Sequence, residues 1–308
     1  MFKQLSECYH QLLMNTENGN QLLKWRNLSP NVTDAFQLGF SPFDDSKIVQ
    51  KLEKHKSTLL ENKLFYESNG ELHDNMRGRL VFPIQNEKGD VVAFGGRDVT
   101  GKDNVKYLNT GDNDYFKKSH ILYGLPQAKK SIERRNYVVL MEGYMDVIQS
   151  HQNNIKNVVS ALGTNLSEEQ ATLIRKYTPN VVIAFDNDGA GSNATIQTAN
   201  LLQKHGCNVL IAYMGSKYEG YDPDDYIKEL GGVSFQKNII AKAYPVIDFF
   251  MKNLAKKYDF SYANNRYDYT EEILKFLRSS NDKQQYAKAM RLLVKNFNIS
   301  TEMLKNIK

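Results

Sequence analysis

The spacing of hydrophobic and polar residues changes along the chain, and each change predicts a different kind of element. Residues 1–70 have mainly helical patterns, and Ser29-Pro30 is typical of a helix start, with a serine N-cap and a proline at the first helical position. From Arg77 the pattern becomes two apolar runs, 80–84 and 91–94, on either side of the turn-forming segment 86–90. We therefore expect helices first, and then a strand, a turn and a second strand.

Strands and helices alternate in residues 136–232. Strands are predicted at 137–141, 156–160, 181–185 and 208–214, with helices near 143–152, 167–177 and 191–204. The segment 167–170 (SEEQ) has the form of a capping box for the second of these helices. Such alternation is typical of crossover units and predicts a mainly parallel sheet, that is, an α/β unit in a chain that is α+β overall.

The remaining chain, residues 233–308, is predicted to be helical, with an amphipathic stretch at 286–297. A length of 308 residues suffices for two or three modules. We expect three, with boundaries at 1–135, 136–232 and 233–308. The first and third carry an excess of Lys and Arg, whereas the middle one carries an excess of Asp and Glu. This distribution suits a metal site beside a surface that binds a polyanion.

Composition excludes several other classes of protein. The chain is 41% hydrophobic and 24% charged, and it has no apolar run long enough to span a membrane. Its first residues do not resemble a signal peptide, so we expect a cytoplasmic protein without membrane contact. The two cysteines, Cys8 and Cys207, have no metal-ligand spacing, so no zinc is expected in these residues.

Acidic residues follow three of the predicted strands. They are Glu142 and Asp146 after the first, Asp186 and Asp188 after the third, and Asp222 and Asp224 after the fourth. Because ligands of an open parallel sheet bind beyond the carboxyl ends of its strands, we expect these side chains to converge. Two unit charges about 4 Å apart repel by roughly 4 kcal/mol at an effective dielectric constant near 20, so such a cluster requires cations. Oxygen ligands without His or Cys favour Mg²⁺ or Mn²⁺.

Each acidic segment also has a simpler interpretation when taken alone. Asp222-Pro223 is typical of a helix N-cap followed by a first-turn proline. The segment 186–189 (DNDG) resembles the start of a calcium loop but lacks the glutamate at its twelfth position, where Gln197 stands. Three such segments after strands of one βα series favour the metal site.

The same segments carry a resemblance to a known family. Residues 141–147 (MEGYMDV), 185–191 (FDNDGAG) and 222–226 (DPDDY) resemble the three signature blocks of the Toprim fold. They look like the version of these blocks found in the DnaG-type bacterial DNA primases. Segments outside the acidic blocks also resemble those primases: 35–42 (AFQLGFSP), 77–84 (RGRLVFPI), 94–97 (FGGR), 106–109 (KYLN) and 116–125 (FKKSHILYGL). One departure is Asn187, where the family usually has glycine.

The resemblance implies the fold and a reaction. It implies a Toprim-type sheet flanked by helices, preceded by a mixed α+β subdomain and followed by a helical tail. The implied reaction is the synthesis of short RNA primers from ribonucleoside triphosphates on a single-stranded DNA template at the replication fork. A replicative helicase is the implied partner, although no domain that would dock it is evident in these residues. Catalysis is assigned to Glu142, Asp186 and Asp188, and metal binding to those three with Asp146, Asp222 and Asp224.

A basic segment precedes the parallel unit and is expected to bind nucleic acid and nucleotides. Its candidate residues are Arg77, Arg79, Arg97, Lys106, Tyr107, Asn109 and Lys118. Arginine suits bidentate phosphate contacts, and an aromatic ring offers a stacking face to a base. The pair Gly95-Gly96 is expected to let the backbone approach a polyanion closely.

Two other functions remain open at the level of sequence. One is a Toprim nuclease or topoisomerase, although a topoisomerase needs further domains and a nuclease needs neither the 94–97 nor the 106–109 segment. The other is a non-catalytic module that binds single strands. A helicase activity in these residues is excluded, because no phosphate-binding loop of the GxxxxGK[ST] type occurs.

Overall fold

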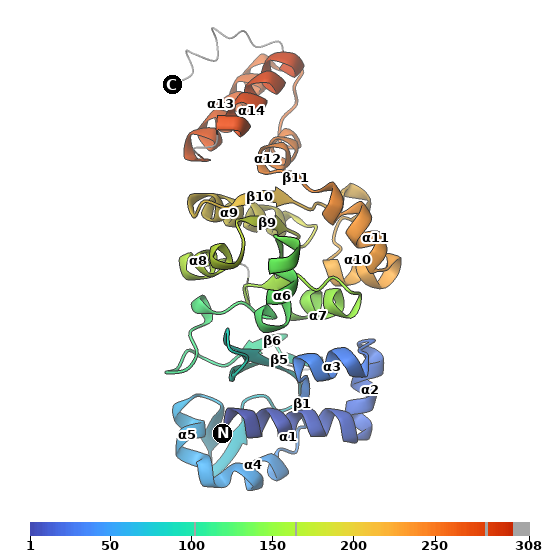
Figure 1. Cartoon of the computed structure of the whole chain (residues 1–308), viewed down its shortest axis with the longest axis vertical. Coiled ribbons are helices and arrows are strands. Elements are labelled where there is room, and N and C mark those ends of the chain that lie inside the picture. The colour runs from blue at the N-terminus through green and yellow to red at the C-terminus, as the bar shows by residue number, and fades with distance from the viewer. Residues whose placement is uncertain (102, 164, 281–282, 298–308) are drawn as a thin grey trace.

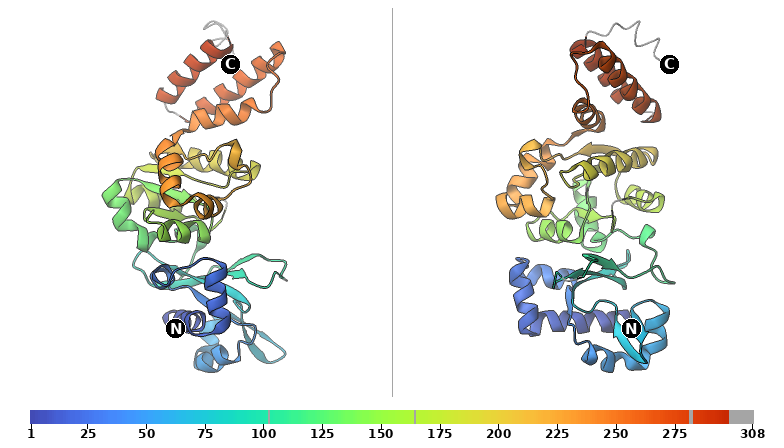
Figure 2. Two further views of the ribbon diagram at one scale, coloured as in Figure 1. Left: turned by 90° about the vertical axis from the view of Figure 1, so that its right-hand side faces the viewer. Right: turned by 180° about the vertical axis from the view of Figure 1, so that it is seen from behind.

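A computed structural model describes residues 1–101, 103–163, 165–280 and 283–297. The chain forms an elongated stack in which successive segments follow one another along the long axis (Figure 1). The N-terminal helices lie at one end, the two main sheets lie in the middle, and the last helices lie at the other end (Figure 2). Residues 298–308, the end of the predicted helical tail, lie outside the described residues.

The N-terminal part combines helices with an antiparallel sheet. Its helices are α1 (Phe2–Asn15), α2 (Glu17–Trp25), α3 (Pro30–Phe36), α4 (Ser46–Leu52), α5 (Lys56–Glu61) and α6 (Leu125–Arg135). The four-stranded sheet has the order β1-β4-β5-β6, formed by Gly39–Ser41, Arg79–Gln85, Val91–Asp98 and Tyr107–Asn109. A separate hairpin joins β2 (Phe65–Ser68) to β3 (Glu71–Asp74). Ser29 caps α3 by accepting a hydrogen bond from the Val32 N–H, as its sequence predicts.

The middle part is the predicted α/β unit. Its five-stranded sheet has the order β11-β10-β9-β7-β8, and only β11 at the edge is antiparallel. The strands are β7 (Val138–Met141), β8 (Val158–Ser160), β9 (Asn180–Ile183), β10 (Asn208–Ile211) and β11 (Tyr244–Pro245). The connecting helices are α7 (Tyr144–Gln152), α8 (Glu168–Tyr177) and α9 (Gly189–Lys204). The mainly parallel sheet and the capping box between Ser167 and Gln170 are therefore confirmed.

The order of these strands determines where a ligand fits. From β7 the chain crosses through α7 to β8, whereas from β9, the other neighbour of β7, it crosses through α9 to β10. The chain thus turns in opposite directions beyond two adjacent strands, which opens a crevice between their carboxyl ends. Glu142 follows β7, and Asp186 lies shortly after β9.

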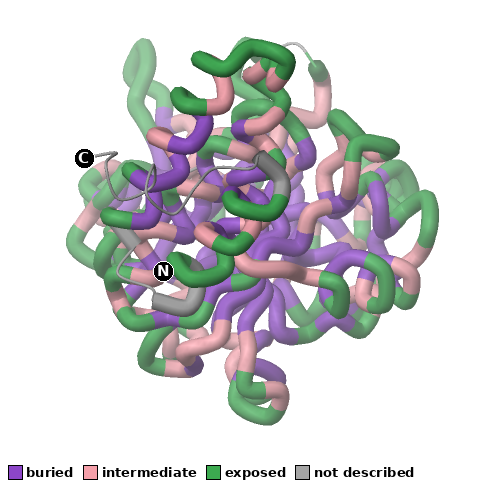
Figure 3. The backbone as a smooth tube through the Cα atoms, turned by 90° about the horizontal axis from the view of Figure 1, so that it is seen from above, coloured by how far each residue is buried: buried purple, intermediate pink, exposed green. Residues whose placement is uncertain are grey.

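Helices complete the molecule. After β10 come α10 (Pro223–Leu230) and α11 (Gly232–Asn238), which lie beside α7 in Figure 1. The tail consists of α12 (Val246–Ala255), α13 (Ala263–Ser280) and α14 (Lys283–Phe297). Seen from above, buried segments fill the centre and exposed segments lie at the periphery (Figure 3). Within the described ranges, no helix has the length and apolar character needed to cross a membrane.

A shared hydrophobic core joins the N-terminal sheet to the parallel sheet. One continuous cluster of buried side chains includes Phe82 of β4, Val139 of β7 and Tyr144 of α7. The ring of Tyr144 stacks on that of Phe82 with centroids 4.7 Å apart and meets the buried ring of Tyr123 edge to face. The two sheets are therefore held in a defined relative position by side-chain packing.

Candidate active site

A cavity of about 460 Å³ lies where the crevice of the parallel sheet meets the antiparallel sheet. Its acidic wall comes from the ends of β7 and β9 and the start of α10, and its basic and aromatic wall comes from α2, β5 and β6. The charged and polar side chains that line it are Arg26, Arg97, Lys106, Tyr107, Asn109, Glu142, Asp146, Asp186, Asp222, Asp224, Asp225 and Lys228. The structure thus brings together five of the six predicted carboxylates and four of the seven predicted template- or nucleotide-binding residues.

Glu142 and Asp186 follow β7 and β9, the two adjacent strands that flank the crevice. A Glu142 Oε1 atom accepts a hydrogen bond of 3.0 Å from the backbone N–H of Asp186, which ties together the ends of β7 and β9. Burial, followed by the charges of Glu142 and Asp222, raises the pKa of Asp186 to about 7. Burial also raises the pKa of Glu142. Both carboxylates therefore lie where negative charge is poorly stabilised by the protein alone.

Asp146 has a positional role in this structure. One carboxylate oxygen accepts from the Gly143 N–H at 2.9 Å, and the other accepts from the Asp224 N–H at 3.3 Å. The side chain is buried, and burial followed by the charges of Asp222 and Asp186 raises its pKa well above the usual value. Asp146 thus bridges the turn after β7 and the first turn of α10.

Asp222 and Asp224 enter the cavity from the start of α10. Asp222 is the N-cap of this helix and accepts from the Asp225 N–H at 2.7 Å, so the simpler interpretation of Asp222-Pro223 is also correct. Asp224 is buried and forms an ion pair with Lys228 one turn later. Its other carboxylate oxygen is buried without a hydrogen-bond partner among the described residues.

Asp188 lies beside this group but faces another cavity. It is the N-cap of α9, where it accepts from the Gly191 N–H at 2.6 Å. It is exposed and lines a neighbouring cavity of about 670 Å³ that also contains Lys256 and Lys257. Its charge nevertheless contributes to the raised pKa of Glu142 and of Asp186.

The donor set suits a hard divalent cation. Every candidate ligand is a carboxylate oxygen, and buried oxygens of Asp186 and Asp224 have no hydrogen-bond partner in the part of the chain that the structure describes. Within that same part, no group of three or more His, Cys, Asp or Glu side chains is already arranged to hold a metal ion. These carboxylates accept hydrogen bonds from backbone N–H groups, and Asp224 pairs with Lys228.

Strands β5 and β6 supply further lining residues of the cavity, among them Arg97, Tyr107 and Asn109. The Arg97 guanidinium donates a hydrogen bond of 2.7 Å to the Tyr107 hydroxyl and lies over its ring, with 5.2 Å between the guanidinium carbon and the ring centroid. The Tyr144 hydroxyl donates to Asn109 at 2.6 Å, which links β6 to the start of α7. Tyr107 remains 38% exposed, so part of its ring is accessible to a ligand.

Gly95 and Gly96 have a different role from the one expected. A Cβ atom on Gly95 would lie 2.4 Å from the Tyr144 hydroxyl oxygen, and one on Gly96 would lie 2.7 Å from the sulfur of Met76. Protein side chains thus fill the space beside both glycines. Their small size permits packing between elements, so the interpretation as a surface for close approach by a polyanion is wrong.

Arg26 is a cavity residue that the sequence did not indicate. It follows α2 directly, and its backbone oxygen accepts from the Gln149 side chain of α7 at 2.9 Å. Only 8% exposed, it keeps Nε and Nη2 buried without hydrogen-bond partners among the described residues. Burial and the nearby Arg97 charge lower the pKa of Arg26. No local signal singles out this residue, because its position depends on contacts more than a hundred residues apart in the chain.

Three predicted basic residues lie outside the cavity. Arg77 and Arg79 line a separate cavity of about 460 Å³, and Arg79 is buried in an ion pair with Asp103. Lys118 lies at the edge of the acidic cavity, beside the lining residue Gly163. A Cβ atom added to Gly163 would be 2.9 Å from the Nζ atom of Lys118.

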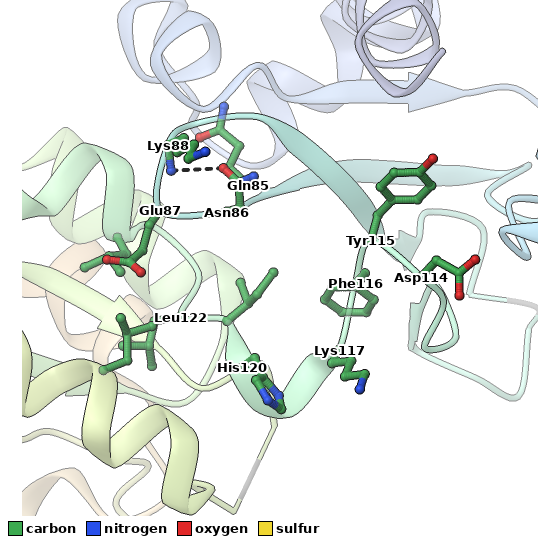
Figure 4. Close-up of a pocket in the computed structure, with 13 residues that line it drawn as sticks. Gln85, Asn86, Glu87, Lys88, Asp114, Tyr115, Phe116, Lys117, His120 and Leu122 are labelled. Carbon is green, nitrogen blue, oxygen red and sulfur yellow. Dashed lines mark hydrogen bonds between the residues drawn. The ribbon is translucent and has the colours of Figure 1, made fainter.

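A further cavity of about 410 Å³ lies below the turn between β4 and β5 (Figure 4). Its floor is apolar, with Leu122 among the residues drawn, and Lys88, Lys117 and His120 lie around it. Glu87 in this turn accepts hydrogen bonds from Lys176 at 2.6 Å and from Tyr177 at 2.7 Å of α8. This cavity therefore belongs to the joint between the two sheets and lacks the carboxylate cluster.

Comparison with known proteins agrees with this geometry. Residues 8–129 match the family described as DNA primase catalytic core, N-terminal domain, and residues 139–227 match the Toprim-like family. The DNA primase of Halalkalibacterium halodurans is 37% identical over 97% of this chain and 51% of its own length. That of Staphylococcus aureus is 34% identical over 99% of this chain and 52% of its own length. The chain spans about half the length of the curated relatives it matches.

Solved structures give the same result. A crystal structure of the Aquifex aeolicus primase, comprising zinc-binding and RNA polymerase domains, has a TM-score of 0.83 and 30% identity and covers 98% of this chain and 73% of its own. A DnaG primase catalytic domain bound to single-stranded DNA has a TM-score of 0.83 and 26% identity and covers 97% of this chain and 95% of its own. The chain belongs to the family of DNA primase catalytic cores.

Proposed function

We propose that this chain synthesises short RNA primers on single-stranded DNA. The observation that carries the proposal is one cavity lined both by carboxylates of the parallel unit and by the guanidinium groups of Arg26 and Arg97 from the N-terminal part. Phosphoryl transfer needs both, because metal-bound oxygens and fixed cations together stabilise the phosphate charge. The related catalytic domain that was solved with single-stranded DNA supports the choice of template.

The carboxylates would hold divalent metal. We assign this role to Glu142, Asp186, Asp188, Asp222 and Asp224, with Mg²⁺ or Mn²⁺ as the ion. When bound, the ions would neutralise the triphosphate and activate the 3′-hydroxyl of the growing strand. Asp146, whose two oxygens accept backbone N–H groups, would hold the turn after β7 and the start of α10 in register.

The opposite wall would bind the nucleotide and the template. Arg26, Arg97 and Lys106 are assigned to phosphate groups, because they line the cavity and form no salt bridge with a carboxylate within the described residues. Tyr107 and Asn109 would contact the base or sugar of the same nucleotide. Arg77, Arg79 and Lys118 lie further out. Of these, Arg77 and Lys118 are exposed and remain candidates for the template backbone.

The wider assignment follows from this reaction. The substrates would be ribonucleoside triphosphates and single-stranded DNA, the product an RNA primer, and the partner a replicative helicase in the cytoplasm. We assign residues 1–135 to template binding, 136–232 to metal binding and catalysis, and 233–308 to a helical subdomain.

The test is incorporation of labelled ribonucleotides on a single-stranded DNA template with Mg²⁺ or Mn²⁺. Wild-type protein should make short RNA, and Asp186→Asn should make none. Cleavage or relaxation of DNA without RNA synthesis would favour the nuclease or topoisomerase alternative. Binding of single strands without any reaction would favour the non-catalytic one.

A further inference from the structure

Trp25, the only tryptophan in the chain, directly precedes Arg26, which lines the acidic cavity. It is the last residue of α2 and is 58% exposed. The guanidinium carbon of Arg26 lies 4.0 Å from the centroid of its ring, so this cation covers one face of the indole. The exposed area leaves the ring open to solvent away from Arg26.

Arg26 connects this ring to the cavity. Only 8% of Arg26 is exposed, and the residue lines the cavity. Two of its guanidinium nitrogens have no hydrogen-bond partner among the described residues. A buried guanidinium with unused donors is costly unless an anion occupies the space beside it. The exposed ring of Trp25 thus lies beside a guanidinium group, that of Arg26, which has unused hydrogen-bond donors.

We propose that Trp25 stacks a nucleobase at the mouth of the cavity while Arg26 binds a phosphate of the same ligand. This inference rests on the proposed function and adds to it a base-binding subsite. Stacking on an indole is tolerant of base identity, because every base has a π-face. The ligand is a nucleobase carried either by the incoming ribonucleoside triphosphate or by the template strand, and both sources are tested separately.

The experiment compares wild-type protein with Trp25→Leu, which removes the ring, and Trp25→Phe, which keeps an aromatic face. Calorimetric titrations with Mg²⁺ present use three probes: ATP alone, a single-stranded oligothymidine alone, and inorganic tripolyphosphate, which has no base. Because the residue is exposed, each variant should unfold at the wild-type temperature. In the wild-type protein the single tryptophan also reports ligand binding by its fluorescence.

We expect Trp25→Leu to bind ATP, the oligonucleotide or both about 5- to 150-fold more weakly, with most of the affinity retained by Trp25→Phe. Loss for ATP alone assigns the ring to the incoming nucleotide, and loss for the oligonucleotide alone assigns it to the template. Tripolyphosphate should bind equally to all three proteins.

Two results would overturn this inference while leaving the proposed function intact. One is wild-type affinity of Trp25→Leu for both nucleobase ligands. The other is an equal loss of affinity for tripolyphosphate, which would show that the ring serves only to hold Arg26. If wild-type protein binds none of the three probes, both proposals fail.

Discussion

Backbone N–H groups stabilise much of the buried negative charge in the cavity. Glu142 accepts one from Asp186, and Asp146 accepts two, from Gly143 and Asp224. Among these carboxylates, the ion pairs within the described residues are limited to that between Asp224 and Lys228. Neutral dipoles hold the carboxylates in place without neutralising them, so burial, followed by the charges of Glu142 and Asp222, raises the pKa of Asp186 to about 7.

Removing one of these charges should therefore abolish activity while leaving the protein at least as stable as the wild type. We expect Asp186→Asn to abolish RNA synthesis and to raise the metal-free unfolding free energy at pH 8 by about 1–2 kcal/mol, a value reduced for solvent screening of a half-buried group. Asp188→Asn should also abolish synthesis, and asparagine preserves the N-cap of α9. Primer assays and denaturant unfolding measure the two effects. Near-normal synthesis by either variant would contradict the assignment.

Asp74, which lies far from the cavity, should make the free energy of unfolding depend on pH. It is fully buried and accepts hydrogen bonds from Tyr9, Ser41 and the Met76 N–H, and burial raises its pKa to about 6. Because the folded state holds this proton more tightly than the unfolded chain, whose pKa is about 4, the stabilisation is complete below pH 4 and is lost as pH rises through 6.

The expected loss from Asp74 is about 2–3 kcal/mol between pH 4 and pH 7. Asp74→Asn lacks the titrating group, so its unfolding free energy should fall less over this range than that of wild type. Denaturant unfolding at several pH values measures the difference. Parallel curves for the two proteins would show that Asp74 has an ordinary pKa.

Arg97 and Lys106 should contribute to binding and not to folding. If each contacts a phosphate of single-stranded DNA, replacing it with alanine should reduce the slope of log affinity against log salt by about 0.7. Lys88→Ala removes the same charge beside the other cavity and is the matched control. If the salt slopes and the nucleotide affinity are both unchanged, Arg97 and Lys106 are ordinary surface charges without a role in binding.

At the scale of elements, the start of α7 joins the two sheets. Tyr144, its first residue, packs on Phe82 of β4, fills the space beside Gly95 of β5 and donates to Asn109 of β6. Glu142 lies two residues before Tyr144, directly after β7. Packing between elements therefore sets the distance between the basic and acidic walls of the cavity.

Gly95→Ala should disturb this joint. The added methyl group would meet the Tyr144 ring, which cannot move freely because it stacks on Phe82, so we expect a destabilisation of about 1–3 kcal/mol and weaker activity. Gly189→Ala is the control for stability, since a Cβ atom there meets nothing within 4 Å and the backbone is not left-handed. Thermal unfolding measures both. Equal unfolding temperatures for wild type and Gly95→Ala would show that the ring moves aside.

At the scale of the whole molecule, the active cavity belongs to neither sheet alone. Its acids come from the parallel unit, whereas Arg97 and Lys106 come from the antiparallel sheet and its connections. These 308 residues contain no Cys/His set with zinc-ligand spacing, whereas the similar Aquifex aeolicus structure includes a zinc-binding domain. The residues proposed to bind metal and nucleotide lie in this chain, and the proposed contacts with the template are contacts with its phosphate groups.

These 308 residues alone are accordingly expected to prime slowly and at many positions. Binding through phosphate contacts is largely independent of sequence and weak at physiological salt. Mapping the 5′ ends of products on a defined single-stranded template measures the choice of start site. Activity should increase when a zinc-binding module or a helicase is added. A sharp preference for one short start sequence, at high rate and without partners, would show that site selection resides in this chain.

Local patterns predicted the parallel unit well. Hydrophobic runs and helix caps involve residues close in sequence, so the strands near 138, 158, 180 and 208 were placed to within a few residues. The short strand β1 was missed, because Gly39–Ser41 becomes a strand only by pairing with β4 about forty residues later. The helical character expected for residues 1–70 is accordingly interrupted by β1 and by the β2–β3 hairpin.

The sequence by itself determined which carboxylates follow the strands, because the alternation of strands and helices along the chain predicts a parallel sheet whose carboxyl ends, and with them Glu142 and Asp186, share one edge. Only the tertiary structure decided how the groups around them are used. It placed Arg26 in the cavity, paired Arg79 with Asp103, and filled the space beside Gly95 with Tyr144. These outcomes depend on contacts between distant segments, and the energies of such contacts depend on burial and fit that no local pattern encodes.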